Sequence, residues 1–95
     1  MTLDPRLFHF FDDRHRLIAW PRRDPLRVAA LQYLAAKFEI GREYDEVAVN
    51  DLLRTWHLFN DPALLRRELY DRKYLGRTRD GRRYWREAVQ VVRFY

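Results

Sequence analysis

Apolar and polar positions along this chain group into four helix-like segments, and three of them follow an Asp-Pro pair. The pairs are Asp4-Pro5, Asp24-Pro25 and Asp61-Pro62. Aspartate accepts hydrogen bonds from the free amides of a first helical turn, and proline is favoured next because its missing donor is not needed there. Asp45 marks a fourth start. The pattern predicts helices over Pro5–Phe11, Pro25–Phe38, Glu46–Trp56 and Pro62–Lys73.

The remaining apolar runs are short and predict strands. Leu17–Trp20 lies between a charged turn and Pro21, and Gly41–Tyr44 could supply a second strand. Asp80-Gly81 separates two further runs, which is a strong hairpin signal. A two-residue loop would set the following cross-strand pairs: Arg79 with Arg82, Thr78 with Arg83, Arg77 with Tyr84, and Gly76 with Trp85. Two arginines would then face each other at the tip, either around an anion or simply tolerated by solvent.

Helix, short strand, helix, helix and hairpin, in that order, are typical of the winged-helix arrangement. We therefore expect an α+β fold, a winged helix-turn-helix with a three-helix core and a C-terminal β-hairpin wing. A chain of 95 residues with 47% hydrophobic content suits one core. The expected single domain comprises an N-terminal helix and strand extension (1–24), the winged-helix core (25–86) and a tail (87–95).

The segment Pro62–Lys73 would be the recognition helix of such a fold. A helical projection places Leu65 and Leu69 on the core side, together with Glu68 and Arg72. The outward side carries Ala63, Arg66, Arg67, Tyr70 and Lys73. Arg67 with Asp71, and Glu68 with Arg72, are spaced for ion pairs along the helix. Arg66, Tyr70 and Lys73 are therefore expected to be the freest outward side chains.

The net charge of +5 is concentrated in this helix and the hairpin. Asp61–Arg86 holds nine basic and four acidic residues, whereas the rest of the chain balances. Such a surplus on a helix and a hairpin is typical of a surface that binds phosphate. Two groups of side chains follow as candidate nucleic-acid contacts. Those for the major groove are Arg66, Arg67, Tyr70 and Lys73, and those for phosphates or a minor groove are Arg77, Arg79, Arg82 and Arg83.

Little in the sequence favours catalysis, a metal or a cofactor. Cysteine and serine are absent, there is no Gly-rich phosphate loop, and His9, His15 and His57 are scattered. We expect a protein that is not an enzyme and has no cofactor or metal. Met1–Arg16 has no continuous apolar stretch, so neither a signal peptide nor a membrane contact is expected. The absence of cysteine favours a cytoplasmic location.

The aromatic residues suggest two roles. Most are expected to face the core: Phe8, Phe11, Trp20, Tyr33, Phe38, Trp56 and Phe59. Tyr84 and Trp85 instead lie among the hairpin arginines, where they could stack on bases. The alternative for Trp85 is packing over Gly76 and the recognition helix.

Three runs of the chain carry a family resemblance: "FFDDRHRLIAWP", "LQYLAAKFEIGREYDEVAVNDLL" and "LLRRELYDRKYLGRTRDGRRYWR". Together they resemble a bacterial domain family of unknown function, which occurs alone or C-terminal to helix-turn-helix transcriptional regulators. The resemblance covers Phe10 to about Arg86 and implies a winged-helix-like fold in a regulatory setting, with no catalytic residues to carry over. The chain departs from the pattern at Arg72-Lys73-Tyr74, where a glycine is expected, so the turn into the wing could be shifted.

Duplex DNA is therefore the first expected partner, in transcriptional control. A protein partner within a regulatory complex, or structured RNA bound through the same arginines, stays open. The apolar tail Ala88–Tyr95 has two interpretations. It could fold back over Pro5–Phe11 and Leu17–Trp20, or it could pair with a second copy to form a homodimer.

Overall fold

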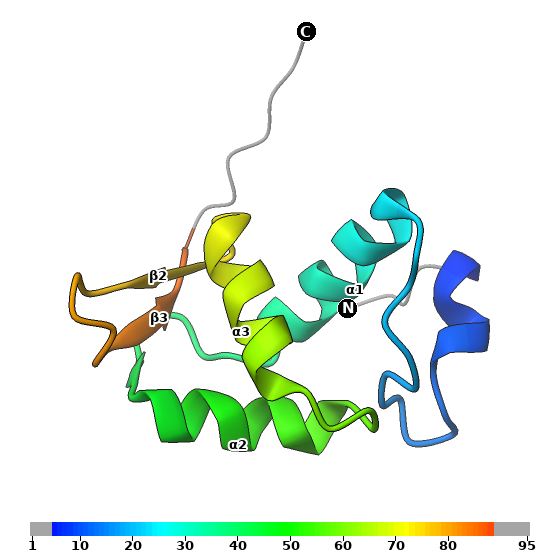
Figure 1. Ribbon diagram of the computed structural model, residues 1–95, viewed down its shortest axis with the longest axis horizontal. Helices are drawn as coiled ribbons and strands as arrows, with labels where there is room; N and C mark the ends of the chain where they lie inside the picture. The colour runs from blue at the N-terminus through cyan, green and yellow to red at the C-terminus, as the bar shows by residue number, and fades with distance from the viewer. Residues whose placement is uncertain (1–4, 89–95) are drawn as a thin grey trace, which may run out of the picture.

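The computed structural model describes residues 5–88, and these residues form an α+β fold (Figure 1). The helices are η1 (Pro5–Phe10, a 3-10 helix), α1 (Asp24–Ala35), α2 (Glu46–Trp56) and α3 (Pro62–Asp71). The strands are β1 (Glu43–Tyr44), β2 (Leu75–Arg77) and β3 (Tyr84–Arg86). They form one antiparallel sheet in the order β1-β3-β2. This order of elements is compatible with a winged-helix-like fold.

Two of the aspartates that were expected to begin helices do so. The Asp45 carboxylate accepts from the Ala48 amide at 2.8 Å, and that of Asp61 accepts from the Leu64 amide at 3.1 Å. Asp24 does not cap α1, because it lies within the first turn and its carboxylate instead binds Arg72. Asp4 lies outside the described residues. A capping aspartate can thus be redirected by a tertiary partner.

The expected strand Leu17–Trp20 is wrong. Leu17 forms only isolated bridges, one to Phe11 and one to His57. Its amide donates to the Trp56 carbonyl at 2.8 Å and its carbonyl accepts from the Leu58 amide at 2.9 Å. The turn after α2 therefore satisfies this backbone, and no ladder is needed. The helix predicted over Pro5–Phe11 is present as the 3-10 helix η1, Pro5–Phe10.

The connection between α2 and α3 is fixed by a buried histidine. His57 is 3% exposed, and its Nε2 accepts from the Asp61 amide at 2.9 Å. Its Nδ1 faces the Leu53 carbonyl oxygen and must donate to it. The ring is therefore in the neutral tautomer with hydrogen on Nδ1. It joins the end of α2 to the start of α3.

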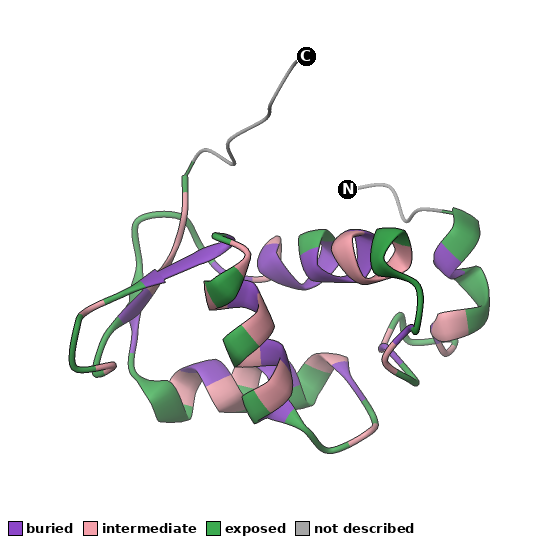
Figure 2. Cartoon of the chain, turned by 45° about the horizontal axis from the view of Figure 1, so that its top comes forward, coloured by how far each residue is buried: buried purple, intermediate pink, exposed green. Residues whose placement is uncertain are grey.

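The core lies between α1, α2, α3 and the sheet (Figure 2). Leucines from most elements are fully buried, namely Leu7, Leu17, Leu31, Leu34, Leu53, Leu65 and Leu69. Phe11, Tyr33 and Phe38 are buried as expected, whereas Trp20, Trp56 and Phe59 are only partly buried. Phe8 is 58% exposed, so its expected core position is wrong. η1 turns only Leu7 fully inward.

The end of α1 is tied to the sheet through Phe38 and Tyr44. α1 stops at Ala35, earlier than predicted, and a tight turn follows. The rings of Phe38 and Tyr44 meet edge to face at 5.1 Å between centres. The Phe38 carbonyl also accepts from the guanidinium of Arg86 at 3.1 Å. These contacts fix the sheet beside the helices.

The hairpin strands keep the predicted register, but the tip differs. Arg77 pairs with Tyr84 and Gly76 with Trp85, as expected. At the tip the Gly81 amide donates to the Thr78 carbonyl at 3.0 Å, so the tight turn spans 78–81. A four-residue loop, 79–82, replaces the two-residue loop that would have opposed Arg79 to Arg82. Gly81 supports this turn with a φ of 72°.

The turn from α3 into β2 forms without glycine. α3 ends at Asp71 rather than Lys73, the Tyr74 amide donates to the Leu69 carbonyl at 2.9 Å, and the Lys73 amide donates to the Tyr70 carbonyl at 3.1 Å. This is the Schellman arrangement, whose left-handed residue is usually glycine. Lys73 occupies that position with a φ of 71°. The hairpin strands keep their register even though the expected glycine is missing.

Candidate nucleic-acid interface

The two sides of α3 divide largely as the sequence predicts. Leu65 and Leu69 are fully buried, and Arg67 and Lys73 are exposed. Arg66 was expected to be free, and that expectation is wrong. Its guanidinium donates to Asn50 Oδ1 and lies 3.4 Å from the Glu46 carboxylate, with 19% of its side chain exposed. Arg66 therefore joins α3 to α2.

The second expected pairing along α3 forms and the first does not. Arg72 Nε lies 3.1 Å from Glu68 Oε1, and its Nη2 lies 2.7 Å from the Asp24 carboxylate. Hydrogen bonding to Asp24 raises the pKa of Arg72, and the same bond lowers the pKa of Asp24. No ion pair joins Arg67 to Asp71, both of which are among the described residues. Arg72, at the end of α3, thus links that helix to α1 through Asp24.

A hollow of about 320 Å³ separates α3 from the wing. Its lining comes from the outward side of α3, the first turn of α2 and the paired strands: Arg66, Arg67, Tyr70, Asp71, Glu46, Arg77 and Tyr84. The guanidinium of Arg77 lies over the Tyr70 ring, 4.2 Å from its centre. Hydrogen bonding with Tyr84, and then with Tyr70, raises the pKa of Arg77. The hollow therefore contains a permanently charged side chain held by two tyrosines.

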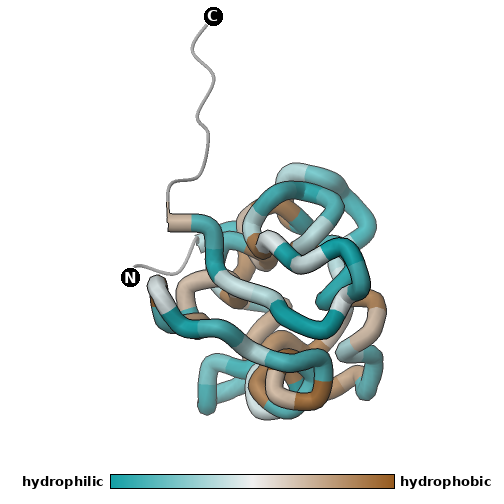
Figure 3. Tube along the Cα trace, turned by 90° about the vertical axis from the view of Figure 1, so that its left-hand side faces the viewer, coloured by the Kyte–Doolittle hydropathy of each residue, from teal (hydrophilic) through white to brown (hydrophobic). Residues whose placement is uncertain are grey.

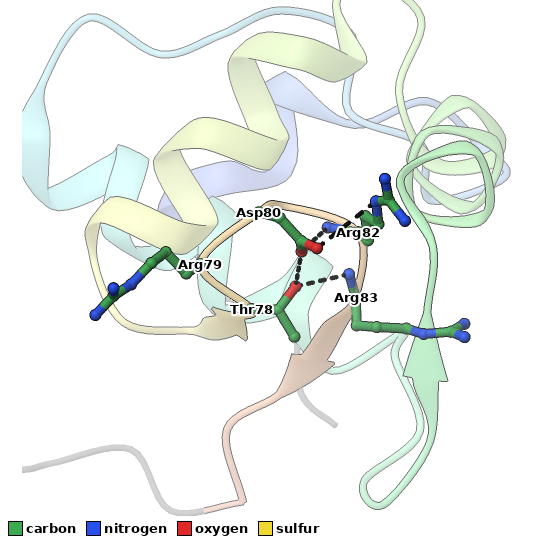
Figure 4. Close-up of a pocket in the computed structure, with 5 residues that line it drawn as sticks. All are labelled: Thr78, Arg79, Asp80, Arg82 and Arg83. Carbon is green, nitrogen blue, oxygen red and sulfur yellow. Dashed lines mark hydrogen bonds and ion pairs between the residues drawn. The ribbon is translucent and has the colours of Figure 1, made fainter.

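The wing tip forms a second, shallower hollow of about 410 Å³ (Figure 4). Asp80 organises its backbone by accepting from the Thr78 hydroxyl at 2.7 Å and from the Arg82 amide at 3.1 Å. The Thr78 bond is the main reason that the pKa of Asp80 is lowered. The guanidinium groups point outward, with Arg79 directed away from Arg82 and Arg83. A hydrogen-bonded turn thus carries long, exposed arginine side chains.

A third hollow, of about 540 Å³, lies between the wing tip and the start of α2. Arg82 and Arg83 line one side, and Asp45, Glu46 and Val47 line the other. Viewed from the wing side, the loop of the hairpin is hydrophilic along its length (Figure 3). Glu46 borders this hollow and the one beside α3, so the basic surface includes carboxylates.

The predicted contact residues therefore fall into three places. Arg66, Arg67, Tyr70 and Arg77 share the hollow beside α3. Arg79, Arg82 and Arg83 share the wing tip, and Lys73 lies outside both at the end of α3. The sequence missed Glu46 and Asn50 as partners of Arg66, because nothing in the pattern of α2 shows which of its polar residues faces α3. Tyr84 could have been found from its predicted pairing with Arg77.

Trp85 packs at the base of the wing. A Cβ built on Gly76 would collide with the Trp85 indole ring and the Glu87 carboxylate. The indole therefore lies against the glycine, as one of the two interpretations of Trp85 held. Glycine is required here by close approach rather than by its backbone angles.

Among residues 5–88 no group of three or more histidine, aspartate or glutamate side chains could hold a metal ion. None of the helices formed by these residues combines the length and apolar character needed to cross a membrane.

Comparison with known proteins assigns this basic α+β chain to a bacterial protein family. Residues 16–86, about three quarters of the sequence, match a family described as uncharacterized proteins conserved in bacteria, DUF2087. The chain belongs to this family. No curated protein and no solved structure matches it. The matched range includes α1, α2, α3 and the sheet, whereas η1 precedes it.

Proposed function

We propose that this protein is a winged-helix module that binds duplex DNA in transcriptional control. α3 would lie in the major groove, and the hairpin of β2 and β3 would be the wing that follows the backbone. The observation that carries the proposal is the placement of unpaired cations on both elements around one hollow. Arg67 belongs to α3 and Arg77 to β2, and both line the space between them.

The side chains have different roles in this proposal. Arg67, Tyr70 and Lys73 are the candidates that would enter or border the major groove, and Arg77, Arg79, Arg82 and Arg83 are candidates for phosphate contacts. Arg66 fixes the angle of α3 on α2 through Asn50. Arg66 remains a candidate contact at the edge of the major groove, although its guanidinium already binds Asn50 and Glu46.

A binding titration at several salt concentrations tests the proposal. Six or more phosphate contacts should reduce the affinity for a mixed-sequence duplex by about 10³ or more between low and moderate salt. Replacing Arg79 and Arg83 by alanine should flatten that dependence. The matched control is Arg14→Ala with Arg54→Ala, which removes the same charge from exposed side chains outside α3 and the wing. No binding of duplex DNA at low salt would refute the proposal, and preference for duplex RNA in competition would replace DNA by RNA.

A second candidate function, a protein-interaction module, is favoured by exposed apolar side chains far from the wing. Ile18 and Leu58 are 43% and 46% exposed, and the backbone pairing of Leu17 with residues 56–58 brings them into one region. Phe8, on η1, is also exposed, at 58%. If this surface binds a partner, capture from nuclease-treated lysate should disappear in a variant with Ile18→Glu and Leu58→Glu. The Arg79 and Arg83 variant should capture that partner normally.

A further inference from the structure

Arg77 differs from every other arginine of the wing in how it is held. It lies on β2, directly opposite Tyr84 across the ladder, and its guanidinium covers the ring of Tyr70 on α3. A guanidinium on an aromatic face is held in place by cation–π attraction, which does not use its edge donors. Arg79, Arg82 and Arg83 have no aromatic ring of this kind among the described residues. Arg77, although exposed, is thus oriented by an aromatic ring before any ligand arrives.

No carboxylate among the described residues neutralises the charge of Arg77. Within residues 5–88 no ion pair links Arg77 or Arg67 to a carboxylate, whereas Arg66 and Arg72 are both paired. An arginine guanidinium is charged at every physiological pH, and hydrogen bonding with the two tyrosines raises the pKa of Arg77 further. A fixed cation without a counter-ion is suited to an external anion.

The space in front of Arg77 suits a small group. At about 320 Å³ the hollow is at the lower end of the roughly 300–1,000 Å³ range of ligand pockets. Three guanidinium groups and two carboxylates line it, and Glu46 is already engaged by Arg66. The lining therefore carries one more positive than negative charge. Polar groups and charge, rather than apolar surface, define what can bind there.

We propose that the hollow between α3 and the wing binds one phosphate group, with the Arg77 guanidinium as its principal ligand and Arg67 as the second. Tyr70 and Tyr84 are positioning residues that hold Arg77 toward the phosphate. The proposal deepens the proposed function and rests on it for the source of the phosphate, the backbone of a bound duplex. A free phosphate ester offers the same oxyanion chemistry, so the two sources have to be distinguished by experiment.

Replacing arginine by lysine separates position from charge. Arg77→Lys keeps the charge but loses the planar fork that can donate two hydrogen bonds to a phosphate. We expect it to weaken duplex binding about tenfold or more without changing the salt dependence, because the number of cations is unchanged. The matched control, Arg14→Lys on an exposed side chain outside α3 and the hairpin, should change affinity less than about threefold. Equal small effects of the two substitutions would overturn the proposal.

Tyr84→Phe provides a variant that tests positioning with the charge and the ring preserved. Tyr84 pairs with Arg77 across the ladder, and the substitution removes only the hydroxyl that raises the pKa of Arg77. It should weaken binding about threefold or more at an unchanged melting temperature. An unchanged affinity would refute the positioning role. Thermal melting of each variant, followed by circular dichroism, identifies any that has lost its fold. If Arg77→Lys has lost its fold, the NMR experiment described next, which uses the native chain, tests the proposal instead.

A direct measurement uses the Nε–Hε resonances of the arginines in the full 95-residue chain. Inorganic phosphate, added at constant ionic strength against chloride, should shift the Arg77 resonance saturably and leave Arg83 almost unchanged. A short duplex should shift the same resonance. If the duplex binds while Arg77 does not respond, the inference fails and the proposed function stands. If phosphate saturates Arg77 but no duplex binds, the site stands with a free phosphate ester as its ligand and the proposed function fails. No response of Arg77 to either probe overturns the inference.

Discussion

The hollow beside α3 and the wing tip contain the same residue type in opposite physical states. At the hollow, Arg66 is bound to Asn50, and Arg77 lies on Tyr70. At the tip, Arg82 leaves 85% of its side chain exposed and makes only a long contact of 3.6 Å to Asp80. Fixed guanidinium groups can select a geometry, whereas exposed ones contribute mainly long-range attraction. Sequence alone counts both as charge, and only packing distinguishes them.

The largest expected effect comes from the base of the wing, which supports both regions. Gly76→Val places side-chain atoms where the Trp85 indole and the Glu87 carboxylate lie. We expect a loss of about 3 kcal/mol in the free energy of unfolding, because the strand pair cannot close over the added atoms. Chemical denaturation measures it. Gly41→Val is the control for β-branching at a glycine, where nothing lies within 4 Å but φ is 86°, so its smaller loss should come from backbone strain. A Gly76 variant no less stable than the Gly41 variant would show that the indole does not lie there.

A smaller effect on the free energy of unfolding should distinguish an arginine that binds a neighbouring helix from one that is exposed. Arg66→Ala removes a guanidinium that is 19% exposed and leaves Asn50 without its partner, so we expect a loss of about 1–2 kcal/mol in the free energy of unfolding. Arg82→Ala at the tip should stay within about 0.5 kcal/mol of the native chain. Urea titrations of the two variants make the comparison. Equal stabilities would mean that the link between α2 and α3 contributes nothing.

Local signals predicted much of the fold. The caps at Asp45 and Asp61, the two leucines of α3 and the register of the hairpin all follow from residues close in sequence. What failed depends on distant partners. Leu17 is satisfied by the turn after α2, and Asp24 is drawn to Arg72, 48 positions away. Tertiary hydrogen bonds of this kind leave no periodic trace in a sequence.

The candidate site shows the same division. Its residues were predicted as a set of cations on a helix and a hairpin, and they do lie on those elements. The prediction of which side chains are free was wrong for Arg66 and Tyr70, because the partners of Arg66 belong to α2 and the Tyr70 ring lies under Arg77 of β2. Charge can be counted along a chain, but the neutralisation of charge requires three-dimensional contacts.

Two residues with positive φ offer a matched comparison of the junction and the tip. Lys73, between α3 and β2, has a φ of 71°, and Gly81, in the wing, has a φ of 72°. Lys73→Gly should raise the free energy of unfolding by about 0.5–1 kcal/mol by relieving the left-handed strain, and Gly81→Ala should lower it by a similar amount. Lys73→Ala removes the same charge while retaining the strain, so it should not stabilise. A Lys73→Gly variant that is less stable than the native chain would contradict the assigned conformation.

The smallest expected effect is the dependence of stability on pH through two aspartates, one in each region. The Asp24 pKa is held below its ordinary value of 3.8, chiefly by the hydrogen bond to Arg72. A carboxylate with a depressed folded-state pKa stabilises the fold above its unfolded pKa, and this contribution is lost as the pH falls through the folded value. Asp24→Asn should therefore lower the melting temperature at pH 6 and flatten its decline below about pH 4. Asp80 also has a lowered pKa, but its partners Thr78 and Arg82 are two residues away and persist in part in the unfolded chain. Asp80→Asn should thus change the acid limb less than Asp24→Asn does, and melting curves at several pH values compare them. If the two variants gave the same acid limb, the bond between α1 and α3 would have no more effect on stability than a local turn.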